Sequence, residues 1–586
     1  MPVINSNSSR TAEVLRVGIF LFLLTIVGLA VYTPWLGLVG DDWWFFANLT
    51  DGRFPAAQFY ENPARPMVAY LWLGLWQILG LRIWGYYAFT FIVQWLTALM
   101  VFIMLRSIFR WSVMDAVTAA AFFLLYPADT THAYLSTLST RLCMLLAVTG
   151  AFLWLRTWME SAWIALMLGT SLVLMTLSLL LYETPLFLFA LLPLLLAGIA
   201  WRGVRAWLTH TALCGLLLSV YLVFRLWIDH VASQGVDSFY VSVNLIPTWL
   251  YSQVRAIPAV MLWNGWLYAM KVMLNFGLME SAGTLILLMA LLLLAFRWLL
   301  QGARDAFRDW RGNIALIGLG FCFSAVAVMP IVVSSFSLEN AVGTLNGRFV
   351  LGAALGHAIF LIGICALPGS VLPLSGQGRA LLRETLVAVL LAIALLGGLG
   401  VQRQYAQAWH RQLDILHALQ DHSPAFDDGT VIVLLDVPVE AFGVRFYYPF
   451  TQLARRFYAN PTLHVLPWQR GSSPEQQLLA FGEEQIVAVT DVVREYTLNF
   501  DYAHVVVFRV EPGGGLQQVH AIGSRYFCED TCGNLPFTLP EGWESAHAPI
   551  MLGNTDSHVA TSVPSHTAWR QLFLSQLDFA DRFELP

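Results

Sequence analysis

The sequence predicts a polytopic α-helical membrane protein that ends in a water-exposed domain of mixed α/β structure. Of its 586 residues, 58% are hydrophobic and 12% are charged, and the mean hydropathy is +0.65. This composition excludes an ordinary soluble protein. Apolar runs long enough to cross a bilayer recur through residues 1–402, whereas residues 403–586 carry 21 of the 37 acidic residues and 11 of the 32 basic ones. The chain is therefore expected to form a transmembrane domain, 1–402, and a separate acidic domain, 403–586.

The first apolar run, residues 17–39, is expected to be a retained transmembrane helix. It is too long for the core of a signal peptide, and no small-x-small cleavage site precedes the acids that follow it. Arg10 and Arg16 precede the run. Positive charges of this kind favour the cytoplasmic side, so the N-terminus is expected inside the cell.

Ten further spans are expected, which makes about eleven in all. They are residues 84–105, 113–127, 138–157, 162–182, 185–201, 207–228, 281–300, 313–335, 349–368 and 382–401. The shorter run 67–81 is expected to lie along the outer surface. If it crossed the membrane, Arg106 and Arg110 would lie outside, against the positive-inside rule. Eleven crossings place residues 403–586 outside, in a multi-pass protein of the plasma (inner) membrane.

The acidic C-terminal residues are expected to form a small mixed α/β domain. Short β-type runs at 431–435, 486–490 and 505–508 alternate with a helical segment at 450–458. Cys528 and Cys532 form the one close cysteine pair, and no second pair completes a zinc site. We favour a disulfide between them, which requires a compartment outside the reducing cytosol. The charge distribution gives no indication of nucleic-acid binding.

Chemistry is expected first at Gly40-Asp41-Asp42-Trp43, directly after the first apolar run. A carboxylate near hydrocarbon is costly unless it is solvated, paired or functional, so two adjacent ones indicate a site. The alternative is a helix end marked by solvated acids and a belt of aromatic residues. Two adjacent carboxylates also permit a divalent metal, without requiring one.

Other ionisable residues are expected at the same outer face. Glu183, in Leu-Tyr-Glu-Thr-Pro, needs a partner at that depth, and an arginine such as Arg141 or a substrate would serve. His132, which lies close to Asp129, is expected either to orient a substrate hydroxyl or to be an ordinary interface residue. Asp129, Arg141, Glu183 and His132 are the candidate substrate-binding residues.

Two cations are candidates for binding a phosphate. The Arg348 guanidinium opens a span and matches a pair of phosphate oxygens, although an arginine at a helix end also snorkels. Lys271 is the single lysine of the chain and is either a point charge for a phosphate or part of the solvated surface.

The order of these signals resembles the GT-C superfamily of integral-membrane glycosyltransferases, which includes protein O-mannosyltransferases and lipid A aminoarabinose transferases. A first helix ends in an outer acidic pair, Arg65-Pro66-Met67 opens a surface helix, and Leu181-Tyr182-Glu183 and Gly347-Arg348-Phe349 follow. The resemblance covers roughly residues 15–400 and rests on short motifs. The C-terminal domain lies outside it.

The resemblance implies an inverting transferase that moves a sugar from a polyprenyl-phosphate donor to a glycan, lipid or protein acceptor at the outer face. Asp41 or Asp42 then acts as general base, and Arg348, Lys271 and Arg65 stabilise the departing phosphate. Some members of the superfamily use a divalent metal and others do not. A transporter or flippase of lipid-linked glycans and a non-catalytic membrane scaffold are the alternatives.

Overall fold

The computed structural model describes most of the transmembrane part and the core of the C-terminal part. The described residues are 6–39, 42–54, 63, 65–159, 163–199, 203–232, 247–275, 278–299, 308–332, 342, 345–437, 447–467, 478–481, 485–489, 497–501, 505–511, 515–519, 521–522 and 550–551. Asp41, Cys528 and Cys532 lie outside these residues, so the structure does not address the predicted disulfide.

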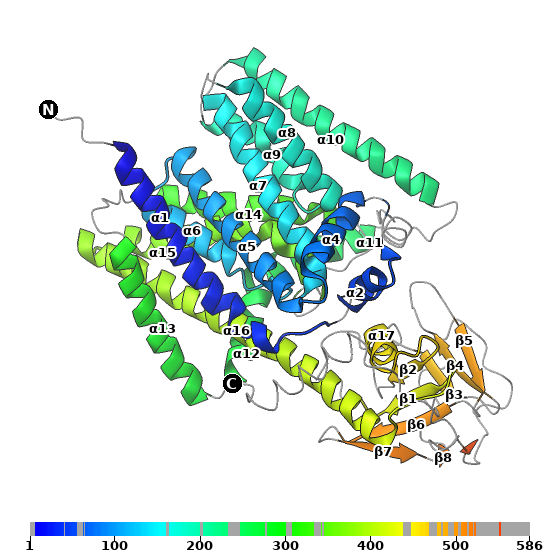
Figure 1. Ribbon diagram of the computed structural model, residues 1–586. Helices are drawn as coiled ribbons and strands as arrows, with labels where there is room; N and C mark the ends of the chain where they lie inside the picture. Colours follow the sequence, from blue (N-terminus) through cyan, green and yellow to red (C-terminus); the bar gives the residue numbers. More distant parts are fainter. Residues whose placement is uncertain are drawn as a thin grey trace. The chain divides into compact units, whose positions relative to one another are not determined.

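By its internal contacts the chain forms two compact units (Figure 1). The first consists of Met1–Pro34 and Gly52–Arg403, and the second consists of Trp35–Asp51 and Gln404–Pro586. The loop after the first predicted span is thus divided, and its acid-bearing part belongs to the same unit as the C-terminal residues. This division was not predicted from the hydropathy or charge pattern.

The first unit is built from helices. Their bounds are α1 Ser6–Thr25, η1 Ile26–Ala30, η2 Thr33–Trp35, α4 Pro66–Leu79, α5 Ile83–Ser107, α6 Val113–Leu124, η3 Leu135–Thr137, α7 Leu138–Met159, α8 Ile164–Leu181, α9 Leu186–Ile199, α10 Val204–Ala232, α11 Pro247–Pro258, η4 Ala259–Asn264, α12 Gly265–Leu274, α13 Leu278–Leu299, α14 Trp310–Val332, η5 Leu345–Ala353, α15 Ala354–Val371 and α16 Gly376–His422. The last residue of η2 and the end of α16 fall in the second unit.

Nine helical segments of the described residues are long and apolar enough to cross a membrane, and they correspond to nine of the eleven predicted spans. The other two, 113–127 and 185–201, contain the shorter apolar helices α6 and α9. At 1.5 Å per residue, the 12 residues of α6 extend only about 18 Å, and all 12 are buried. A helix that is apolar on every side is expected in the middle of a bundle. The run 67–81 forms the short helix α4.

Close helix pairs in the first unit depend on small residues. A Cβ placed on Gly320 or Gly356 would overlap backbone atoms of the partner helix, where α14 packs on α15. Between α7 and α8, the Ser171 hydroxyl donates to the Gly150 carbonyl at 2.6 Å. In a bilayer, burying an apolar side chain against another helix is no more favourable than burying it against lipid. Close backbone approach of this kind therefore stabilises the contact between helices.

The first helix ends in a π-helical turn, η1, which leaves backbone groups without their usual helical partners. Gln402 of α16 supplies them: its Nε2 donates to the Gly28 carbonyl at 2.7 Å, and its Oε1 accepts from the Tyr32 N–H at 3.2 Å. Gln402 is fully buried. Such a pairing satisfies backbone groups that water cannot reach.

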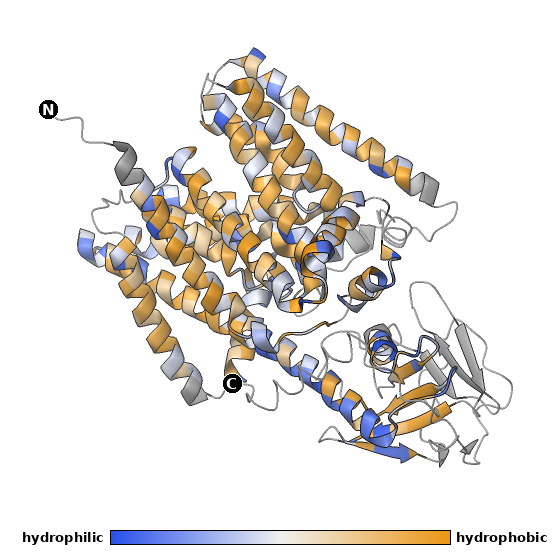
Figure 2. Ribbon diagram, in the orientation of Figure 1, coloured by the Kyte–Doolittle hydropathy of each residue, from blue (hydrophilic) through white to orange (hydrophobic). Residues whose placement is uncertain are grey.

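Hydropathy changes along α16, which is 47 residues long. Figure 2 shows apolar residues along its first half and mainly polar residues towards its end. The predicted span 382–401 corresponds to the apolar half, and the helix continues to His422 without a break.

The second unit contains the predicted mixed α/β structure. Parallel strands β2 (His464–Pro467), β1 (Val431–Leu435) and β6 (Val505–Val510) form a four-stranded sheet with antiparallel β7 (Leu516–Val519), and α17 (Tyr447–Phe457) connects β1 to β2. All five residues of β1 are buried, as expected for a parallel strand that is covered on both faces. The remaining strands are β3 Leu478–Phe481, β4 Gln485–Val489 and β5 Thr497–Asp501, which form an antiparallel sheet, and the paired β8 Ala521–Ile522 and β9 Ile550–Met551.

Candidate functional site

The acidic pair leads into α2, Asp42–Thr50, in the second unit. The Asp42 carboxylate is fully buried and accepts a hydrogen bond from the Val39 N–H at 3.3 Å, while the Asp42 N–H donates to the Val39 carbonyl at 3.1 Å. These two contacts close a tight turn from Val39 to Asp42, directly before α2. Asp42 therefore helps to fix the beginning of α2.

Two groups of contacts hold α2 within the second unit. The Trp43 indole is fully buried, donates to Gln412 Oε1 at 3.3 Å and lies 6.0 Å from the Trp409 ring. At the other end of α2, Arg456 of α17 pairs with Asp51 at 2.7 Å and donates to the Ala47 carbonyl at 3.2 Å. Packing against α17 and the end of α16 thus positions the acid-bearing helix.

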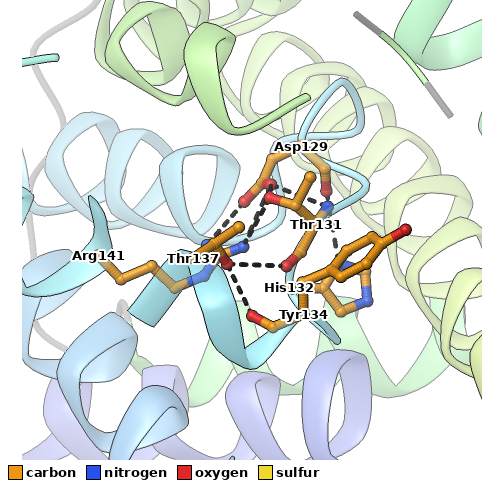
Figure 3. A network of polar contacts seen from close by, with 6 residues as sticks. All are labelled: Asp129, Thr131, His132, Tyr134, Thr137 and Arg141. Atoms are coloured by element: carbon orange, nitrogen blue, oxygen red, sulfur yellow. Dashed lines mark hydrogen bonds and ion pairs between the residues drawn. The ribbon is translucent and has the colours of Figure 1, made fainter. Parts of the chain in front are cut away.

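In the first unit, Asp129 and Arg141 form a buried ion pair (Figure 3). Arg141 Nη1 lies 2.7 Å from Asp129 Oδ2, and Nη2 lies 3.2 Å from Oδ1. The N–H and hydroxyl of Thr131 also donate to Oδ1, at 3.1 and 2.7 Å. Burial alone would raise the pKa of Asp129, but Arg141 and these hydrogen bonds hold the pKa below its usual value.

A pocket opens beside this pair, with about 400 Å³ of space including its mouth. Tyr126, Asp129 and His132 line it, together with Tyr268 of α12 and Gly397–Gly398 of α16. The Tyr126 hydroxyl and His132 Nε2 are buried and have no hydrogen-bond partner among the described residues. Burial and Arg141 lower the pKa of His132, with Asp129 opposing them, so the ring is neutral. A neutral imidazole and a phenol can together bind a hydroxyl group of a ligand.

Glu183 pairs with Arg65, which corrects the suggestion of Arg141 as its partner. Arg65 Nε and Nη2 lie 3.1 and 2.5 Å from the two carboxylate oxygens, and the guanidinium lies 3.9 Å from the centre of the Tyr182 ring. Burial would raise the pKa of Glu183, but Arg65 and the nearby Arg225 lower it to about 2. Because Arg65 is already neutralised, it is a weaker candidate for binding a phosphate than its charge suggests.

The two remaining predicted cations differ in their surroundings. Arg348 is half-buried in η5, and this element packs against the Glu183 loop, where a Cβ on Gly352 would lie 3.2 Å from the Thr184 side chain. Lys271 is exposed on α12, two residues beyond Ala269, which lines the pocket. Within the described residues, no group of three metal-ligating side chains is present.

Several side chains of this region were not predicted from the sequence. Gln94 of α5 places its amide oxygen 2.7 Å from Arg141 Nε when the amide is oriented to satisfy both groups. Thr137 donates to the Thr131 carbonyl at 3.1 Å and so closes the turn that carries Asp129. Neutral residues of this kind carry no charge signal. A glutamine in an otherwise apolar helix was the one available sign.

No family model and no curated protein matches the chain. Among solved structures, it is similar to ArnT from Cupriavidus metallidurans bound to undecaprenyl phosphate, with 13% identity over 80% of this chain and 87% of that one and a TM-score of 0.35. It is also similar to the same protein in the apo state, with 14% identity over 74% and 84% of the two chains and a TM-score of 0.38. ArnT is an aminoarabinose transferase of the GT-C superfamily, the superfamily that the sequence motifs resemble.

Proposed function

We propose that the protein is a membrane glycosyltransferase that takes a sugar from a polyprenyl-phosphate donor and passes it to an acceptor at the outer face. The observation that supports this most is that two ion pairs lie at one end of an apolar helix bundle. The Asp129–Arg141 pair lies where α7 begins, and the Arg65–Glu183 pair lies where α8 ends. Because only four residues separate α7 from α8 in the sequence and the two helices pack together, these positions share one end of the bundle.

This arrangement suits a substrate with a charged head and an apolar tail. The apolar helices offer a surface to a polyprenyl chain, and Arg348, in η5 beside the Glu183 loop, offers a guanidinium to a phosphate. A transporter would instead be expected to place charged residues along a path through the middle of the membrane. In each described ion pair of the first unit, at least one partner lies at the end of a helix or in a loop.

The reaction proposed is a single displacement. A carboxylate takes the proton of the acceptor hydroxyl while the oxygen of that hydroxyl bonds to the anomeric carbon. The bond between that carbon and the phosphate oxygen breaks, and the polyprenyl phosphate leaves with the electron pair. Attack from the face opposite the phosphate inverts the anomeric carbon. Arg348 is the cation proposed to stabilise the phosphate, because it is half-buried in η5, which packs beside the Glu183 loop.

Of the two adjacent acids, we assign the base to Asp41. The Asp42 carboxylate is buried and holds the turn that precedes α2 by accepting from the Val39 N–H, which is a structural role. In this proposal Asp129, Arg141 and His132 contact the substrate. Asp129 and His132 line the pocket, and Arg141 lies beside it, paired with Asp129. The N-terminus is placed in the cytoplasm and the C-terminal domain outside the inner membrane.

The test is sugar transfer by purified protein in detergent, with a panel of radiolabelled polyprenyl-phosphate sugars, with and without chelator. Undecaprenyl-phosphate sugars are the first members of the panel. We expect Asp41→Asn to lower turnover by about 10² to 10⁴-fold, the usual contribution of a general base, with an unchanged melting temperature. Asp421→Asn, an exposed acid on α16, is the control and should keep full activity.

Two outcomes would contradict the proposal. Full activity in Asp41→Asn would remove the assigned base, and full activity in Asp42→Asn as well would remove the acidic pair from the reaction. The transporter would be favoured if wild-type protein moved a labelled lipid-linked glycan across the membrane of proteoliposomes and transferred sugar from no donor.

A further inference from the structure

A second polar pocket lies at the opposite end of α6 from Asp129. Asp115 is in the first turn of α6 and Asp129 follows its last turn, so the helix length of about 18 Å separates them. The pocket has about 380 Å³ of space including its mouth. It is bordered by Asp115, Arg308, Asn313, Arg379 and Arg383 and by the Gly369–Ser370 turn of α15.

The charges of this pocket do not cancel. Asp115 pairs with both Arg308, at 2.7 Å, and Arg383, and it also accepts from the Ser112 hydroxyl at 3.0 Å. Arg379 donates through Nε to the Leu374 carbonyl at 3.0 Å and forms no ion pair with any described residue. Three guanidinium groups therefore face one carboxylate, and the pocket carries a formal charge of about +2 from side chains that are always protonated or ionised at neutral pH.

Two polar atoms in the wall lack partners. Arg383 Nε and Asn313 Oδ1 are buried and make no hydrogen bond with any described residue, and the two residues are 7% and 1% exposed. Burying such groups without partners is unfavourable. Arg383 Nε is a hydrogen-bond donor within the guanidinium cluster, and Asn313 Oδ1 is an acceptor. A phosphodiester that carries a hydroxyl group would satisfy both: its oxygens accept from Arg383 and Arg379, and its hydroxyl donates to Asn313.

Apolar side chains continue directly from the pocket to the surface. Val371 and Leu372, which follow Ser370, are 66% and 46% exposed. Leu381, between the two wall arginines, is 49% exposed, and so is Ile314, which follows Asn313. Exposed aliphatic residues beside a basic pocket are expected where a lipid places its headgroup between helices and its acyl chains along them.

We propose that this pocket binds the phosphate headgroup of an anionic phospholipid, such as phosphatidylglycerol. The lipid bridges α14 and α16 through Asn313, Arg379 and Arg383 and compensates the excess positive charge. This site is separate from the proposed transferase site, and its occupancy does not depend on the proposed function.

The test is retention of added phosphatidylglycerol by the full-length protein in detergent, measured by native mass spectrometry beside phosphatidylcholine. Arg379→Gln removes a wall charge that has no carboxylate partner, so folding should survive. Arg311→Gln is the matched control, because Arg311 is exposed near the start of α14 and does not border the pocket. A further sample receives millimolar inorganic phosphate before the lipid.

We expect wild type and Arg311→Gln to retain phosphatidylglycerol in preference to phosphatidylcholine, and Arg379→Gln to bind it about fivefold more weakly. Equal retention in all three proteins, or equal retention of the two lipids by the wild type, would overturn the proposal. Complete displacement of the lipid by inorganic phosphate would overturn the lipid assignment and leave a site for free phosphate.

Discussion

The Asp129–Arg141 pair allows a quantitative prediction, because both side chains are almost fully buried, at 9% and 3% exposure. Asp129→Asn leaves the Arg141 guanidinium buried without an opposite charge. Removing one member of a buried pair costs about 3 to 5 kcal/mol. Asparagine keeps one acceptor oxygen for Arg141, so we expect the lower end, about 3 kcal/mol of the free energy of unfolding.

The double variant Asp129→Asn/Arg141→Gln tests the reasoning further. If each single variant costs about 3 kcal/mol mainly by stranding its partner, the double variant should cost far less than their sum, with a coupling of about 2 to 3 kcal/mol. Unfolding in mixed micelles titrated with a denaturing detergent measures all four proteins.

The control is the Glu13–Arg106 pair. It has a similar forked geometry, at 2.7 and 3.1 Å, but side chains 22% and 32% exposed. Glu13→Gln should cost about 0.2 to 1 kcal/mol, as for exposed pairs. Additive losses at Asp129 and Arg141, or a loss no larger than that of Glu13→Gln, would refute the reasoning.

Two further predictions concern pH and packing. Because Arg65 and Arg225 lower the pKa of Glu183 to about 2, its contribution to stability is present above the unfolded-state pKa near 4.3 and is lost as the pH falls through the folded value. Melting temperatures between pH 2 and 6 should fall more steeply for wild type than for Glu183→Gln, and parallel curves would contradict this. Gly37→Ala should lower the free energy of unfolding by about 1 to 3 kcal/mol, because a Cβ there overlaps the Trp409 ring. Gly74→Ala, which has open space around it, is the control and should be neutral or slightly stabilising; equal melting temperatures for the two would count against the packing of Gly37 on Trp409.

The segments predicted from hydropathy are helices in the structure, and the strands predicted at 431–435, 486–490 and 505–508 are present within a residue or two. Hydropathy predicted a helix at α6 but did not show that it is only 12 residues long and buried on every side. An apolar helix has the same composition whether its neighbours are lipid or protein, and only the packing of α6 among other helices shows that all of its residues are buried.

The partners of the charged residues could not be assigned from the sequence. The position of Glu183 between two apolar runs predicts that its carboxylate needs a partner. The sequence does not identify that partner, because Arg65 lies 118 positions away along the chain. Arg141 was an equally plausible partner from the sequence. In the structure its guanidinium donates instead to Asp129 and Thr131. Asp42 was expected as a site residue, and the sequence did not reveal that its buried carboxylate accepts from the Val39 N–H in the turn before α2.

The sequence by itself determined the class of protein and the position of its ionisable residues, because hydropathy and charge are local properties that add along the chain. Tertiary structure alone decided which of these residues meet. It also decided that Trp35–Asp51 belongs to the unit of the C-terminal residues, through contacts such as Trp43 with Gln412 and Asp51 with Arg456. Those contacts join positions about 370 and 400 residues apart, and nothing in either local segment specifies the other; their complementarity exists only once the chain has folded.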